Sequence, residues 1–149
     1  MISGRTELLP LLGDPVETVK SPMIYNPWFA HHGIDAVVVP MAVKATDYAM
    51  TLQQLLRMGN VRGLLVTMPQ KVQTLALMDA LSPVAQVAGA CNAVIRRPDG
   101  TLLGEQFDGA GFVRGAQRKG LDFRGTRVLI SGAGGVGCAI AASIAEAGA

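Results

Sequence analysis

The chain has 149 residues, enough for one ordinary domain core or for one small domain and part of another. Hydrophobic residues make up 50% of it, only 16% of the residues are charged, and the mean hydropathy is +0.35, which excludes a disordered chain and indicates a well-buried α/β protein. The formal net charge of +2 is too small to indicate nucleic-acid binding.

The sequence shows no membrane or export segment. Its longest apolar run, residues 36–43, is too short to cross a bilayer, and no long apolar signal segment stands at the N-terminus. We therefore expect a cytoplasmic protein whose partners are neither nucleic acid nor membrane. The two cysteines, Cys91 and Cys138, lack the spacing of a structural disulfide or zinc site, so we interpret both as small buried hydrophobic residues and expect no metal.

The first predicted elements are a strand, a helix and a second strand. Residues 7–13 form the first strand, which the turn signal Gly13-Asp14-Pro15 closes. Ser21 reads as an N-cap and Pro22 as the first position of a helix that runs toward His32. Its buried side is predicted to comprise Met23, Trp28 and Phe29. Residues 36–39 contain a run of β-branched valines and predict the second strand of a βαβ unit.

An amphipathic helix and a central strand follow. Residues 46–58 have helical periodicity, with Thr46 as the N-cap and Gly59 as the end. The apolar stripe of this helix is Tyr48, Leu52, Leu55 and Leu56. Residues 62–67 contain a continuous apolar run, which is typical of a strand covered on both faces of a parallel sheet.

Lys71 is the candidate for the chemistry. Pro69 ends the central strand because proline has no N–H for a sheet, and residues 70–78 predict a helix with Lys71 in its first turn. A helix N-terminus carries partial positive charge, so a lysine there is either solvated or held by a carboxylate for a purpose. A plain surface lysine on a loop stays open as the alternative.

The next segment predicts a short helix, a hairpin and a connecting helix. Ser82-Pro83 starts the short helix. Residues 91–97 and 101–104 flank Pro98-Asp99-Gly100, which predicts an antiparallel pair at the sheet edge. We interpret the glycine-rich residues 108–111, with the helix that follows them, as the connection between two domains.

A glycine loop stands near the end of the chain. Residues 127–131 predict a buried strand, and a Gly-x-Gly-x-x-Gly motif and an alanine-rich helix follow it directly. The motif consists of Gly132, Ala133, Gly134, Gly135, Val136 and Gly137. Such glycines let backbone N–H groups approach a pyrophosphate at the helix N-terminus, so we predict a dinucleotide site. The alternative is a tight turn needed only to pack the helix on the strand.

One strand and one helix cannot bury their own apolar faces, and a Rossmann sheet needs several more strands. We therefore expect that the chain is a fragment that stops inside this unit, or that something else supplies the missing half.

Taken in this order, the motifs resemble the shikimate dehydrogenase family over essentially the whole chain. The stretches that carry the resemblance are Gly13-Asp14-Pro15 with Ser21-Pro22 and Asn26, residues 66–71, residues 89–92, residues 104–111, and the glycine loop. The resemblance implies a mostly parallel α/β substrate-binding domain over residues 1–105. Residues 106–149 are then the linker helix and the first βα unit of an NADP-binding Rossmann domain, with the active site in the cleft between the domains.

The resemblance also implies roles for individual residues. Lys71 and Asp108 match the catalytic pair, and the substrate-contacting positions are Ser21, Thr67, Lys71, Asn92 and Asp108. The chemistry is sensible because oxidation of a secondary alcohol requires a base for the hydroxyl proton, and the reverse reaction requires an acid for the developing alkoxide. Asp108 also reads as a helix N-cap, and the two roles are compatible.

The chain departs from the family pattern at several positions. Val19 replaces one of two serines expected to hold the substrate carboxylate, and losing such a bond should cost about 1–3 kcal/mol. Lys20 compensates only if its side chain turns inward. Leu65 stands in place of asparagine, Tyr25 in place of histidine, and Gln106-Phe107 in place of Asn-Thr.

We therefore expect an NADP-dependent oxidoreductase, with NAD as the other cofactor choice, that interconverts a cyclic hydroxy acid of the shikimate or quinate type and its keto form. Its expected partner is that small molecule, and assembly as a homodimer is left open. The alternatives are a non-catalytic substrate-binding fragment, an inactive relative, or another two-domain dehydrogenase of the methylenetetrahydrofolate dehydrogenase type. Asn92 and Asp108, following Lys71, argue against the last of these.

Overall fold

The computed structural model describes residues 2–149 and has an α/β architecture built on a six-stranded sheet with the order β2-β1-β3-β5-β6-β4. The strands are β1 (Glu7–Gly13), β2 (Ala36–Ala42), β3 (Gly63–Val66), β4 (Ala80–Leu81), β5 (Ala93–Arg96) and β6 (Leu102–Glu105). The helices are α1 (Ser21–His31), α2 (Tyr48–Leu55), the 3-10 helix η1 (Gln73–Leu77), α3 (Pro83–Ala88), α4 (Asp108–Arg118) and α5 (Gly135–Glu146).

Parallel and antiparallel pairs meet in this one sheet. Strand β1 runs parallel to both β2 and β3, β5 is antiparallel to β3 and β6, and β4 is parallel to β6. The predicted α/β class and the hairpin of β5 and β6 are confirmed. The predicted place of the hairpin at the sheet edge is wrong, because the short strand β4 pairs outside β6 and forms that edge.

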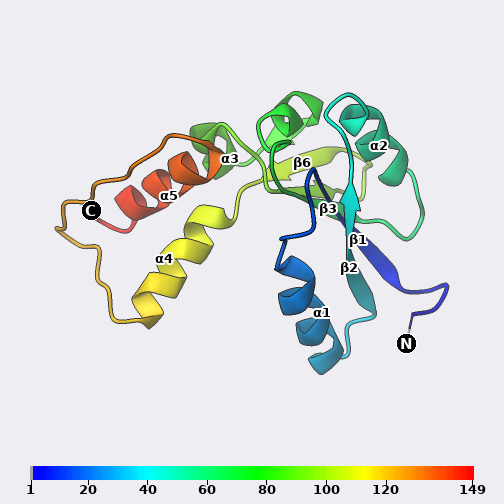
Figure 1. Ribbon diagram of the computed structural model, residues 1–149, viewed down its shortest axis with the longest axis horizontal. Coiled ribbons are helices and arrows are strands. Elements are labelled where there is room, and N and C mark those ends of the chain that lie inside the picture. Colours follow the sequence, from blue (N-terminus) through cyan, green and yellow to red (C-terminus); the bar gives the residue numbers. More distant parts are fainter. Residues whose placement is uncertain (1) are drawn as a thin grey trace.

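The main core lies between the sheet and α2 (Figure 1). Its buried members are Leu12, Tyr48, Leu52, Leu56, Val61, Leu64, Val66 and Val94. The Tyr48 hydroxyl forms a hydrogen bond of 2.7 Å with Oγ1 of Thr74, and burial raises the pKa of Tyr48 to about 12. The apolar stripe predicted for this helix therefore does face the core, although α2 begins at Tyr48 rather than at Thr46.

Helix α1 covers the edge of the sheet rather than a face of it. The Asn26 side chain bonds the backbone of Val38 in the edge strand, accepting from its N at 2.7 Å and donating to its O at 3.1 Å. These bonds satisfy strand groups that have no neighbouring strand. The predicted buried side of α1 is wrong for Met23 and Trp28, which are 70% and 50% exposed, whereas Phe29 is half-buried. The polar side chain of Asn26 makes the contact with the strand. Ser21 is also no N-cap, because the cap residue is Lys20.

The segment that carries Lys71 is a turn followed by η1, not the predicted α-helix over residues 70–78. An α-helix would need the Lys71 carbonyl oxygen to accept from the residue four positions later. That oxygen instead accepts from the N of Cys91 at 2.9 Å, and Leu75 N donates to Val72 O. A contact distant in the sequence therefore stops the helix and ties Lys71 to the segment before β5.

The C-terminal helices α4 and α5 pack on each other and project to one side of the sheet (Figure 1). The strand predicted over residues 127–131 is not formed. A strand needs a neighbour to complete its hydrogen bonds, and no other strand of residues 2–149 lies beside this segment, in which Leu129 is 96% exposed. Among the described helices, none has the length and apolar character needed to span a bilayer.

Candidate active site

Lys71 and Asp108 form an ion pair beyond the end of β3. The Lys71 Nζ atom lies 2.5 Å from Oδ2 of Asp108, and the two side chains are 14% and 27% exposed. Lys71 belongs to the turn after β3, and Asp108 is the first residue of α4. The interpretation of Asp108 as the N-cap is therefore wrong, because the cap residue is Phe107. A lysine held in this way is not a plain surface lysine, and its amine and the carboxylate share a partly water-excluded site where a proton can be exchanged.

Asn92 completes the constellation. Its Nδ2 donates to Oδ1 of Asp108 at 2.8 Å, while its Oδ1 accepts from the N of Phe107 at 2.9 Å. Both carboxylate oxygens of Asp108 are therefore engaged, one by Lys71 and the other by Asn92. The backbone of Asn92 is fixed as well, because its O accepts from Val66 N and its N donates to Glu105 O.

A pocket of about 260 Å³ opens over this pair. Its lining includes all the residues expected to contact substrate, namely Ser21, Thr67, Lys71, Asn92 and Asp108. The remaining lining residues are Leu11, Val19, Lys20, Tyr25, Leu65 and Val66. Segments far apart in the sequence thus bring the predicted residues to one cavity, which the Lys71–Asp108 ion pair borders.

The departures from the family pattern divide into two groups. Val19, Tyr25 and Leu65 line the pocket, so they face any molecule bound in it. Phe107 does not line it and is 52% exposed. Gln106 is buried, at 2% exposed, and bonds to the backbone of Asp108 and Ala90.

The glycine loop lies on the other side of Lys71. Gly134, Gly135, Val136 and Gly137 line a second pocket, of about 240 Å³, together with Met68, Pro69, Lys71 and Val72. Gly132 and Ala133 are outside this lining. A Cβ added to Gly135 would lie 2.7 Å from Cβ of Ala90, so a side chain here would push the loop away.

The loop has the features that a bound dinucleotide needs. Gly132 has φ +103°, which L side chains rarely adopt, and a Cβ at Gly137 would lie 2.5 Å from the Gly132 carbonyl oxygen. Helix α5 begins at Gly135, and the first N–H groups of a helix have no acceptor inside it. Backbone N–H groups without an acceptor inside the helix, on a loop whose glycines carry no side chains, fit a pyrophosphate, so the residues present fit this cofactor group.

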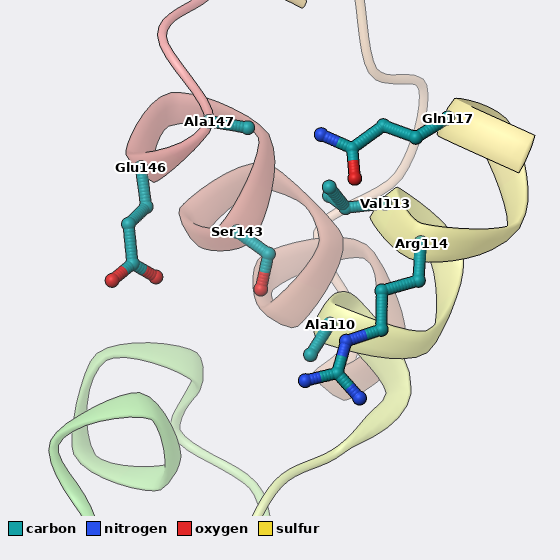
Figure 2. Close-up of a pocket in the computed structure, with 7 residues that line it drawn as sticks. All are labelled: Ala110, Val113, Arg114, Gln117, Ser143, Glu146 and Ala147. Carbon is teal, nitrogen blue, oxygen red and sulfur yellow. The ribbon is translucent and has the colours of Figure 1, made fainter. Parts of the chain in front are cut away.

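Helix packing sets the distance between the two pockets. Helix α4, which begins at Asp108, lies against α5, which begins at the glycine loop. Figure 2 shows the two helices side by side, with Ala110 and Ser143 at their contact and a further pocket of about 230 Å³ beside them. That pocket contains none of the predicted site residues.

Sequence reasoning did not assign a role to Gln106. The only indication in the sequence was a polar residue two positions before Asp108, directly after β6. The prediction that Cys91 is buried is confirmed, since it is fully buried. Burial, with a smaller contribution from Glu105, raises the pKa of its thiol to about 11. The same prediction is wrong for Cys138, which is only half-buried. Within residues 2–149, no group of three or more His, Cys, Asp and Glu side chains is arranged to hold a metal ion.

Comparison with known proteins gives consistent matches. The family model described as "Shikimate dehydrogenase substrate binding domain" matches residues 11–94. The shikimate dehydrogenase (NADP(+)) of Rubrobacter xylanophilus is 38% identical over 147 residues, which cover 99% of this chain and 51% of the relative. The chain thus spans about half the length of the curated relatives it matches.

Solved structures agree in fold. Shikimate 5-dehydrogenase from Listeria monocytogenes, crystallised with shikimate and NAD, matches with a TM-score of 0.91 and 37% identity over 99% of this chain and 50% of that one. The 5-ketofructose reductase of Gluconobacter sp. strain CHM43 matches with a TM-score of 0.88 and 31% identity over 99% of this chain and 52% of that one.

Proposed function

Because the chain belongs to the shikimate dehydrogenase family, we propose that it forms the substrate-binding part and the start of the cofactor-binding part of an NADP-dependent oxidoreductase. The substrate is a cyclic hydroxy acid of the shikimate or quinate type, which the enzyme interconverts with its keto form. Residues 1–105 make up the substrate domain, and residues 106–149 hold the linker helix and the glycine loop.

The observation that carries this proposal is the position of Lys71 between two pockets. Its side chain lines both the cavity that contains Ser21, Thr67, Asn92 and Asp108 and the cavity bordered by the glycine loop. A dehydrogenase must bring the reacting carbon of its substrate beside the nicotinamide, with a proton acceptor at the hydroxyl. A lysine on the border of both cavities meets that requirement.

The proposed proton path runs through the ion pair. Lys71 Nζ, in its amine form, accepts the substrate hydroxyl proton as the alcohol is oxidised, and in the reverse direction the ammonium donates a proton to the developing alkoxide. Asp108 holds the lysine in place through the 2.5 Å contact and stabilises the ammonium that forms. The dinucleotide, when bound, supplies the hydride acceptor or donor. Asn92 keeps the second oxygen of Asp108 from rotating away.

Substrate choice is proposed to depend on the wall opposite this pair. Ser21 and Lys20 supply polar groups there, whereas Val19 and Leu65 supply none. A carboxylate at that wall lacks one hydroxyl donor, so binding of shikimate is expected to be weaker by about 1–3 kcal/mol, or roughly ten- to a hundredfold. Val19→Ser is expected to lower KM for shikimate, and an unchanged KM would point to Leu65 instead.

A neutral polyhydroxy ketone is a second candidate substrate. The apolar side chains of Val19 and Leu65 in the pocket favour it, because a neutral group needs no anion-binding donor there. The similarity to a protein named 5-ketofructose reductase supports the same choice.

The test is cofactor-coupled turnover of the longest natural form of the protein. Shikimate, quinate and neutral ketoses are tried with NADP, NAD and their reduced forms, and near-ultraviolet absorbance reports the cofactor. Turnover is expected with NADP, and Lys71→Ala is expected to reduce kcat far more than it changes KM. Lys119→Ala, an exposed lysine at the end of α4, is the matched control and should leave both constants unchanged.

Two outcomes would count against the proposal. Full turnover in Lys71→Ala would remove that lysine from the chemistry. No turnover with any substrate, while ligands still bind, would favour a non-catalytic relative that only binds a small hydroxy compound.

A further inference from the structure

Gln106 is a buried amide that bonds the backbone of Asp108, one member of the proposed acid/base pair. It is 2% exposed and stands between the end of β6 and the start of α4. Its Oε1 accepts from the backbone N of Asp108 at 2.9 Å, and its Nε2 donates to the carbonyl oxygen of Ala90 at 3.4 Å. Burying an amide is unfavourable unless both of its ends are bonded, and here both are.

The bond to Asp108 replaces a missing helix cap. The first N–H groups of a helix need acceptors from outside it, and the N-cap residue of α4 is Phe107, whose side chain makes no capping bond. The side chain of Gln106 provides that acceptor for the first residue of the helix. The backbone of Asp108 is therefore fixed by the residue two positions before it.

The bond to Ala90 connects the pair to the glycine loop. Ala90 is fully buried, and its Cβ lies where a side chain on Gly135 would stand. The next residue, Cys91, donates its N to the Lys71 carbonyl oxygen, and Asn92 bonds both Asp108 and Phe107. Residues 90–92 thus touch the lysine, the aspartate and the loop, and Gln106 bonds this segment to the aspartate.

We propose that Gln106 is a positioning residue that holds the Asp108 carboxylate in register with Lys71 and ties the pair to the segment beside the glycine loop. The Lys71–Asp108 contact is observed in the structure, and only its use in turnover rests on the proposed function. Gln106 itself lines neither of the two pockets beside Lys71, so it acts through Asp108.

The first readout does not require activity. Trace acetylation of lysines in the folded chain, measured by mass spectrometry, reports how open the amine of Lys71 is to the reagent. The contact with Asp108 holds the Lys71 amine, so a loosened pair leaves this amine more open to the reagent. In Gln106→Met, which has similar volume and no hydrogen bonds, acetylation of Lys71 relative to Lys119 is expected to rise about fivefold, toward the value in Asp108→Asn.

Matched variants separate positioning from general loosening. Gln86 is exposed and donates a bond to Leu81 O away from the pair, so Gln86→Met should leave the Lys71 to Lys119 ratio unchanged. Gln106→Asn keeps an amide that is one methylene shorter and should give an intermediate ratio. This second variant keeps the test decisive if Gln106→Met does not fold.

The second readout is turnover with whichever substrate the full-length protein accepts. Both Gln106 variants are expected to lower kcat and shift its pH profile with little change in KM, since Gln106 does not touch the substrate. An unchanged acetylation ratio in both variants would overturn the positioning role. Absence of wild-type turnover would overturn the proposed function, while the acetylation ratio would still decide the role of Gln106.

Discussion

Gly109→Ala tests the packing that places the Lys71–Asp108 ion pair beside the glycine loop. Gly109 is the second residue of α4, and a Cβ added to it would overlap the carbonyl oxygen of Ala139 and approach Oγ of Ser143 in α5. The serine side chain can rotate away from the new methyl group. The Ala139 carbonyl is part of the backbone of α5 and cannot, so the helix itself has to move.

The magnitude follows from two opposing effects. Overpacking of this kind costs about 1–3 kcal/mol of stability. We expect a cost near the top of this range, because the new methyl group overlaps backbone that cannot rotate away. Alanine is favoured over glycine inside a helix by about 1 kcal/mol. We therefore expect Gly109→Ala to reduce the free energy of unfolding by about 2 kcal/mol.

The matched control is Gly115→Ala in the same helix. A Cβ at Gly115 would have nothing within 4 Å, so only the higher helix propensity of alanine affects the stability of this variant. The free energy of unfolding should rise by about 0.5–1 kcal/mol. The same chemical change is therefore expected to have opposite effects at two positions in one helix.

Thermal and urea unfolding of the 149-residue chain measure both effects. A difference of about 3 kcal/mol between the variants corresponds to roughly 6–12 °C in Tm. Equal stabilisation by both alanines would refute the close approach of α4 to α5, and with it the argument that this packing sets the place of the glycine loop relative to Asp108.

Two further predictions concern buried titrating groups. In a Tyr25→Phe background, phenolate absorbance of the folded protein should appear only near pH 12, because burial raises the pKa of Tyr48 from 10.0 to about 12. The folded state keeps this proton where the unfolded state has lost it, so stability should fall as pH rises from 10.0 toward 12, and an earlier phenolate signal would contradict the burial of Tyr48. An alkylating thiol reagent should modify Cys138 in the native protein and spare Cys91, whose burial raises its thiol pKa to about 11, until the chain unfolds. Equal reaction rates would show that Cys91 is accessible.

Local sequence patterns predicted those parts of the fold that depend on contacts between residues close together in the sequence. Ser82 caps α3 by accepting from the N of Ala85 at 3.2 Å, as the Ser-Pro pair indicated. Gly100, with φ +88°, occupies the turn between β5 and β6. The stripe of α2 faces the core, and α5 begins inside the glycine loop. Each of these depends on residues within a few positions of one another.

Other elements were decided by partners that no local pattern reveals. Helix α1 has an apolar sequence, yet Asn26 binds it to the edge of the sheet. Its side chain completes the hydrogen bonds of the Val38 backbone, which faces no further strand, and Met23 stays exposed. Lys71 lies in a turn rather than a helix because its carbonyl oxygen accepts a hydrogen bond from the N of Cys91 instead of from a residue of the next helical turn. Strand β4 has only two residues, too few to show a pattern.

The candidate site combines both kinds of information. The sequence by itself determined which residues to examine, since motif order and residue chemistry singled out Lys71, Asn92, Asp108 and the glycine loop. Only the tertiary structure decided that Asp108 pairs with Lys71, that Lys71 borders both pockets, and that Gln106 bonds the backbone of Asp108. The reason is physical: these contacts join side chains from separate elements, and their geometry exists only once the sheet and helices have packed.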